Sequence, residues 1–184
     1  MRSYGLSPFS DIAKIALEIR DAFERHIVFH SDYAPAESGT LALWILHTHL
    51  FPLRLFEATP YLMITAPTSE AGKSQVFKVA RRLVRAPFVI VDPSPAAIFR
   101  GIDGRQPTLL IDESDLLAES KQLKMILNSG FEPGTPVARA GKEYSTYCPK
   151  AFSGIAGERQ PLTNSTFVQM HPDSDAPEGF AREV

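Results

Sequence analysis

The sequence predicts an α/β protein with a mostly parallel β-sheet covered by helices on both faces, in three αβα layers, preceded by an N-terminal helical segment. Two observations lead to this class. Short apolar runs with the length of buried strands alternate with segments whose apolar residues recur at helical spacing. Strands that alternate with helices of this length favour right-handed crossovers, and such crossovers build a parallel sheet.

The composition fits one soluble domain. The 184 residues are 44% hydrophobic, enough for one full core. The net charge of −2 gives no global attraction to nucleic acid, so any such contact must come from a local patch. A single cysteine, Cys148, excludes an internal disulfide framework. Neither a signal peptide nor a membrane span is evident, so we expect a cytoplasmic protein without a membrane partner.

The N-terminal segment, residues 1–57, is expected to form two helices that pack on the core. The first has apolar residues at helical spacing after Ser10, its expected cap, and the second opens at 38–40. Residues 58–170 form the predicted core domain. The tail, residues 171–184, is rich in Pro, Asp and Glu and is expected to be mobile.

The histidines of this segment do not predict a metal site. His26 and His30 lie four residues apart but have no third ligand at a clear spacing. His47 and His49 fall on different faces of the second helix and cannot chelate together. Trp44 is predicted to be a core residue.

Residues 61–74 are predicted to be a buried strand, a tight loop and the first turn of a helix. Gly72, Lys73 and Ser74 have the form of the end of a phosphate-binding loop. In such a loop backbone N–H groups surround the phosphates, the lysine reaches the outer phosphate oxygens and the serine hydroxyl ligates magnesium. The general pattern has glycine where this chain has Pro67.

Residues 107–113 are an apolar strand that ends in two adjacent carboxylates, the form of a Walker B strand. A nucleoside triphosphate needs a hard cation at its outer phosphates and a positioned water. Asp112 would hold the magnesium, and Glu113 would orient or deprotonate the water. The alternative is that both carboxylates merely end a strand in a polar loop.

The remaining elements complete the alternation. The helix that begins at Lys73 has a basic side, which is a solvated face in most helices of this kind. Helices are also expected from Ser94-Pro95 to Arg100 and from Leu116 to Asn128. Further buried strands are predicted at 88–91, 150–155 and 165–170.

A change of pattern between residues 136 and 147 predicts a β-hairpin with a glycine turn. Its basic and aromatic residues are a mixture that contacts single-stranded DNA by charge and stacking in other proteins. A purely structural hairpin is the equal alternative. The residues in question are Arg139, Lys142, Tyr144 and Tyr147.

With these motifs in place, the chain resembles a helicase-like P-loop ATPase domain of the AAA+ type, in particular an uncharacterised family of phages and mobile elements. The resemblance covers about residues 25–170 and includes the proline at position 67. It implies a P-loop NTPase sheet with strand order 5-1-4-3-2 and ATP at the carboxyl ends of the strands. The segments that carry it are 41–44, 47–49, 64–74, 94–100, 107–113, 126–130, 149–151 and 154–157.

The resemblance also implies residue roles, with ATP and Mg²⁺ as cofactors. Glu113 and Lys73 would be catalytic, Ser74 and Asp112 would hold the metal, and Ser153 is the candidate polar sensor. The family's arginine before the last strand is replaced by 164–166, Asn-Ser-Thr, and no helical lid follows. A neighbouring subunit of a homo-oligomer, with Arg159 as the candidate, or an outside partner would then supply a positive charge. The residues expected to contact the nucleotide are Pro67, Thr68, Ser69, Glu70, Ala71, Gly72, Lys73, Ser74, Gln75 and Ser153.

Three functions compete at this point. The first is an ATP hydrolase that couples turnover to movement on DNA. The second is a degenerate nucleotide-binding regulatory module with little hydrolysis. The third, a small-molecule kinase, would not need the adjacent Asp112 and Glu113 and should have a substrate lid.

Overall fold

Five parallel strands form the central sheet of the computed structural model, in the order β2-β3-β6-β1-β7. The structure describes residues 8–29, 34–66, 72–91, 94–112, 120–155 and 165–169. The predicted α/β class with a parallel sheet is confirmed. The strands are β1 (Tyr61–Ala66), β2 (Pro87–Ile90), β3 (Thr108–Ile111), β6 (Lys150–Ile155) and β7 (Ser165–Gln169).

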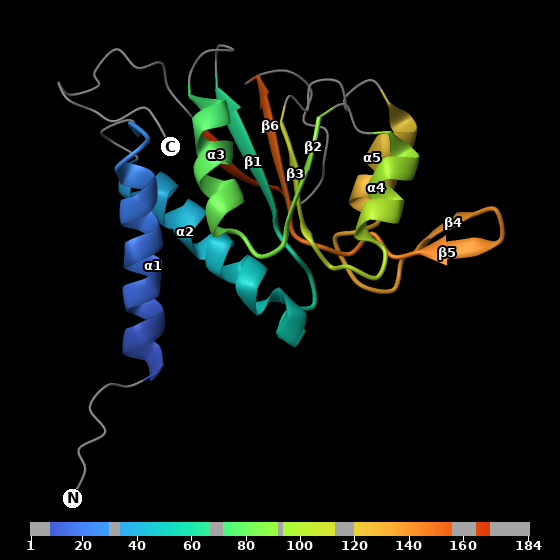
Figure 1. Cartoon of the computed structure of the whole chain (residues 1–184), viewed down its shortest axis with the longest axis horizontal. Coiled ribbons are helices and arrows are strands. Elements are labelled where there is room, and N and C mark those ends of the chain that lie inside the picture. Colours follow the sequence, from blue (N-terminus) through green and yellow to red (C-terminus); the bar gives the residue numbers. More distant parts are fainter. Residues whose placement is uncertain are drawn as a thin grey trace, which may run out of the picture.

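Helices cover both faces of this sheet. Figure 1 shows α1, α2 and α3 on one side of the strands and α4 and α5 on the other. A small hairpin, β4 (Val137–Arg139) and β5 (Lys142–Tyr144), projects beyond α4 and α5. The helices are α1 (Pro8–Glu24), α2 (Ala34–Leu50) with a 3₁₀ turn at Phe51–Leu53, α3 (Lys73–Leu83), α4 (Pro95–Ile102) and α5 (Lys121–Asn128).

Side-chain alternation divides the core into two clusters, because successive residues of a strand point to opposite faces. The first cluster joins the sheet to α1, α2 and α3, and the second joins it to α4, α5 and the hairpin. The strands contribute Leu62, Ile64, Ala66, Leu110 and Ala151 to the first cluster. They contribute Tyr61, Met63, Leu109, Ile111 and Phe152 to the second.

The predicted start of α4 and the predicted hairpin turn are confirmed. Ser94 caps α4 by accepting a hydrogen bond from the Ala97 amide, and Pro95 is the first helical residue. The hairpin turn consists of Ala140 and Gly141, both with positive φ, as a two-residue turn between right-twisted strands requires.

The predicted starts of three helices are wrong. Helix α1 begins at Pro8, so Ser10 lies inside it instead of capping it. Helix α2 begins at Ala34, so Ser38 lies inside it, where its hydroxyl contacts the Ala34 carbonyl one turn back and Glu24 of α1. Helix α5 begins at Lys121, since Ser120 before it has extended backbone and accepts the Leu123 amide; residues 116–119 of the predicted helix lie outside the described residues.

The strand predicted at 88–91 is not buried. It is observed as β2, whose only sheet neighbour among the described residues is β3. Val89 is 38% exposed, and Val91, just past the strand, is 74% exposed. The apolar run therefore marks a half-covered edge strand.

Three aromatic side chains of α2 behave as predicted. Trp44 is buried and donates its ring N–H to the Pro60 carbonyl. His47 hydrogen-bonds with Thr59, whereas His49 bonds to the Leu83 carbonyl, so the two histidines serve different faces of the helix. His30 lies outside the described residues.

Candidate functional site

The carboxyl edge of the sheet brings three of the predicted segments together. Strand β1 ends at Ala66, and α3 begins at Lys73 after Gly72, which has φ +81°. A side chain at that φ would be strained, so glycine fits the position. Gly72 offers no side-chain cap, and its carbonyl accepts the Gln75 amide. The start of α3 is the positive end of the helix dipole, which favours an anion.

Lys73 and Ser74 occupy that first turn with contrasting exposure. Lys73 is only 8% exposed and lies on the inner side of α3 with Val76, Phe77 and Ala80. Ser74 is exposed. A cation held at a helix N-terminus adds to the positive end of the helix dipole, so this turn favours a negatively charged ligand.

Asp112 and Ser153 form the polar pair of the site. Asp112 directly follows β3, and its carboxylate accepts a hydrogen bond of 2.5 Å from the hydroxyl of Ser153 on β6. Ser153 is fully buried, and in the register of the sheet it pairs with Ile64 of β1. Strand β6 thus lies between the strand that leads into α3 and the strand that ends at the carboxylate.

The pair lies on the α3 side of the sheet. Leu110 and Ala151 belong to the core cluster beneath α3, and Asp112 and Ser153 come two residues later on the same strands. Because successive side chains of a strand point to opposite faces, residues two apart, such as Leu110 and Asp112 or Ala151 and Ser153, lie on the same face of the sheet. The carboxylate, the buried hydroxyl and the start of α3 therefore share one edge and one face of the molecule.

This donor set suits magnesium and phosphate. Carboxylate and hydroxyl oxygens are ligands that Mg²⁺ prefers, and its remaining positions are commonly filled by water and phosphate. Asp112 and Ser74 are the residues that would hold such an ion, and Lys73 would face the phosphates. The described residues contain no cluster of three or more His, Cys, Asp or Glu side chains, so a dedicated all-protein metal cage is not found there.

Several predicted site residues lie outside the part of the chain that the structure describes. They are Pro67, Thr68, Ser69, Glu70, Ala71, Glu113 and Arg159. Of the residues predicted to contact the nucleotide or metal, the structure places Gly72, Lys73, Ser74, Gln75, Asp112 and Ser153, all at the carboxyl edge.

The hairpin residues predicted to touch DNA are mostly engaged within the protein. Lys142 forms an ion pair of 3.3 Å with Asp103 and lies over the ring of Tyr144. Tyr144 packs against Phe99 of α4 at 4.6 Å between ring centroids. These contacts hold the hairpin on α4, which favours the structural interpretation.

The other two residues of that prediction differ from each other. Tyr147 packs against Phe51 and donates its hydroxyl to the Phe56 carbonyl. Arg139 is exposed and bonds only to the carbonyl of its neighbour Ala138 among the described residues. Arg139 is thus the one residue of the four whose observed contacts do not tie it to another element.

A buried lysine at the opposite edge of the sheet was not predicted. Lys150, the first residue of β6, is 0% exposed. Its ammonium has three N–H groups and lies 2.8–3.0 Å from the carbonyl oxygens of Gly130, Thr146 and Cys148 and 3.2 Å from the Tyr61 hydroxyl, so four acceptors share three donors. We call this arrangement the Lys150 cage. Burial lowers the pKa of Lys150, and the cage opposes that effect by surrounding the ammonium with acceptors.

The sequence alone does not indicate the cage, because its four acceptors come from three separate segments of the chain. The residue in the sequence that comes closest to indicating the cage is Gly130, where the structure has no room for a side chain. A Cβ atom there would collide with the Thr146 carbonyl and come within 2.5 Å of the Lys150 ammonium.

No known protein-family model matches the chain, and a search of curated proteins finds no similar sequence. The helices of the described residues include none with the length and apolarity needed to cross a membrane. The function is therefore inferred from the residues at the carboxyl edge.

Proposed function

We propose that the protein is an ATP-binding P-loop ATPase of the AAA+ type that hydrolyses ATP with magnesium as a helicase-like or DNA-remodelling motor domain. The observation that carries the proposal is the Asp112–Ser153 pair, held at 2.5 Å on the same face and edge of the sheet as the start of α3. A P-loop ATPase needs a cation ligand and a phosphate-binding helix start at one edge.

The sheet order supports the same class. Counted along the chain, the five strands of the large sheet run 5-1-4-3-2 from the β7 edge to the β2 edge. This is the order implied by the resemblance to AAA+ domains. Ligands of open parallel sheets bind at the carboxyl ends of the strands, which is where the proposed site lies.

Each residue then has a role that its position permits. The amides of the first turn of α3 and the Lys73 ammonium bind phosphate, while Ser74 and Asp112 hold the cation. The buried Ser153 hydroxyl fixes the orientation of the Asp112 carboxylate. Glu113 is assigned the positioning of water because it follows Asp112 directly. When bound, ATP would supply the phosphoryl group, and the magnesium ion would neutralise negative charge on the phosphates.

The degenerate nucleotide-binding module remains the second candidate. Its support is the sequence Asn-Ser-Thr at 164–166, where the resembling family has an arginine. Such a module binds ATP with the same residues but turns it over slowly unless a neighbouring subunit supplies the charge. Binding and turnover must therefore be measured separately.

The proposal is tested by the thermal stability of the purified chain with and without magnesium-ATP. At about 100 times Kd, a ligand stabilises the folded state by about 2.7 kcal/mol. For a chain of this size that corresponds to a rise in Tm of roughly 5–10 °C. The wild type should show this rise, and Lys73→Ala should not.

Lys121→Ala is the matched control, since Lys121 is an exposed lysine of α5 on the opposite face of the sheet. It should respond to ATP like the wild type. Equal stabilisation of wild type and Lys73→Ala would rule out the proposed phosphate site, and no stabilisation of the wild type by any nucleoside triphosphate would rule out the class.

A further inference from the structure

The outer surface of α3 has an unusual concentration of positive charge. Between Glu70 and Asp92 the sequence contains five basic residues and no acidic one, in a chain whose net charge is −2. Lys73 is buried at the proposed phosphate site, and Arg85 is half-buried and bonds to the Gln106 carbonyl. The three exposed cations, Lys78, Arg81 and Arg82, are called the α3 basic surface below.

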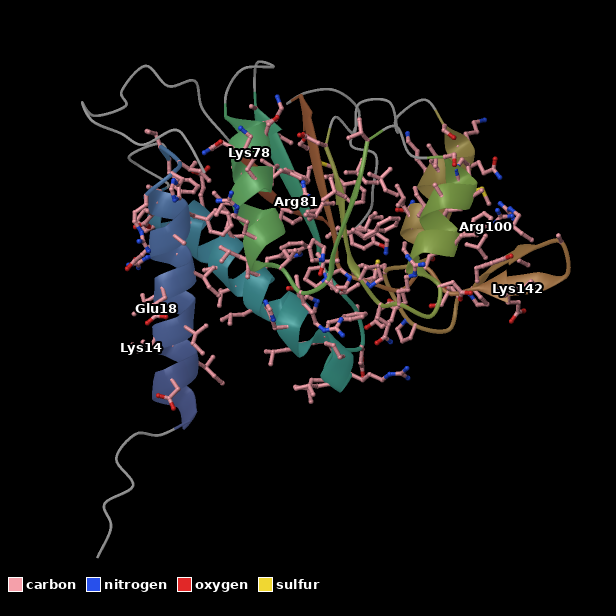
Figure 2. The ribbon with its side chains drawn as sticks, in the orientation of Figure 1. Lys14, Glu18, Lys78, Arg81, Arg100 and Lys142 are labelled. Atoms are coloured by element: carbon pink, nitrogen blue, oxygen red, sulfur yellow. The ribbon has the colours of Figure 1, made fainter. Side chains whose placement is uncertain are left out.

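These three side chains share one side of the helix. Spacings of three and four residues place them within about one turn, a rise of roughly 6 Å along the axis. Figure 2 labels Lys78 and Arg81 on α3, and both side chains are exposed. The buried residues of α3 lie on its other side, so replacing the exposed cations does not disturb the core.

The side chains of the α3 basic surface differ from those of Lys14, Arg20 and Lys142 in their partners. Lys14, Arg20 and Lys142 each form an ion pair with a carboxylate. Among the described residues, no hydrogen bond or ion pair involves the side chains of the α3 basic surface. Its charge is therefore not neutralised by the described part of the protein.

Uncovered apolar surface lies on the same side of the sheet. Val89 pairs in register with Leu110, whose side chain belongs to the cluster beneath α3, so Val89 faces the α3 side. It is 38% exposed, and Val91 beyond it is 74% exposed. Strand β2 contacts α3. A ligand bound along the α3 basic surface would therefore have the exposed side chains of Val89 and Val91 beside it, where sugars and bases could pack.

We propose that the α3 basic surface binds the phosphate backbone of single-stranded nucleic acid, and that the hairpin does not provide the main contact. Three adjacent cations over about 6 Å match the density of phosphates along one strand, one per about 3.4 Å in a duplex. The hairpin's Lys142 is already paired with Asp103. The inference rests on the proposed function in that it names the surface through which a DNA motor would hold its substrate.

The test measures binding of a fluorescent oligothymidylate by anisotropy at several salt concentrations, without nucleotide. Each phosphate contact contributes about 0.7 to the salt slope for single strands. Replacing Lys78, Arg81 and Arg82 with alanine should lower the slope by about 2 and weaken binding roughly 100-fold at about 0.1 M salt.

Two control variants make the result specific. A triple variant with alanine at Lys14, Arg105 and Lys121, exposed cations outside α3, changes net charge equally and should bind like the wild type within about threefold. The double variant Arg139→Ala with Lys142→Ala should also retain binding. Loss of binding in either control, with retention in the α3 triple variant, would overturn the proposal.

Two further measurements separate this inference from the proposed ATP site. Magnesium-ATP should still stabilise the α3 triple variant, because Lys73 is unchanged; circular dichroism checks its fold. Polyglutamate of similar charge is the competitor. If it displaces the oligonucleotide at equal charge concentration, the surface binds acidic polypeptides, and the nucleic-acid assignment is wrong. Wild-type protein that fails to bind oligothymidylate at low salt also overturns it, whatever the outcome for ATP.

Discussion

Lys150→Met tests whether the Lys150 cage stabilises the fold. Methionine has nearly the same length, so the change removes the donors with little change in volume. The carbonyls of Gly130, Thr146 and Cys148 then lose hydrogen bonds of 2.8–3.0 Å inside the protein. An unsatisfied buried acceptor costs about 1–3 kcal/mol. Removing a buried ammonium recovers part of that cost, because the ammonium no longer has to be desolvated.

We therefore expect Lys150→Met to lower the free energy of unfolding by about 2–5 kcal/mol. For a chain of this size the Tm falls by roughly 5–15 °C. Thermal and urea denaturation followed by circular dichroism measure both quantities. Lys121→Met, at an exposed lysine, should stay within about 0.5 kcal/mol of the wild type. A Lys150→Met protein as stable as the wild type would refute the reasoning.

The remaining stability predictions concern Gly130 and His47. Gly130→Ala should destabilise by about 1–3 kcal/mol in urea denaturation, because its Cβ would collide with the Thr146 carbonyl; unchanged stability would contradict the cage geometry. Burial lowers the pKa of His47 below 6.5, so as pH falls below 6.5 the imidazole is protonated in the unfolded state before it is protonated in the folded state. The free energy of unfolding should therefore fall as pH drops below 6.5. The fall ends below the folded-state pKa, where both states are protonated. His47→Gln should flatten the Tm profile between about pH 5 and pH 8, and an unaltered profile would exclude His47 as its cause.

Much of the proposed site follows from local sequence. The strand, the glycine and the helix that begins at Lys73 are adjacent in the chain, so their geometry depends on backbone preferences that the residues themselves carry. The same holds for the Ser94 cap and the Ala140-Gly141 turn. These features were predictable because few distant contacts decide them.

The features that sequence reasoning missed depend on distant contacts. The early start of α2 goes with the Ser38 bond to Glu24 of another helix. The exposure of β2 follows from its place at the sheet edge, which its apolar sequence does not reveal. Lys150 is buried because acceptors from segments up to 89 residues away converge on it. The ion pair between Lys142 of the hairpin and Asp103 also joins residues far apart in the chain, and the hairpin sequence does not indicate it.

The most direct test of the ATPase proposal is to measure ATP binding and ATP turnover on the same samples of wild type, Asp112→Asn and Glu113→Gln, across protein concentrations and with single-stranded DNA. The wild type should bind and hydrolyse magnesium-ATP. Glu113→Gln should bind equally well while turnover falls about 100-fold or more, and Asp112→Asn should bind more weakly because the cation loses a ligand. A Glu113→Gln variant that hydrolyses ATP as fast as the wild type, or a wild type that binds ATP without any turnover, would contradict the account.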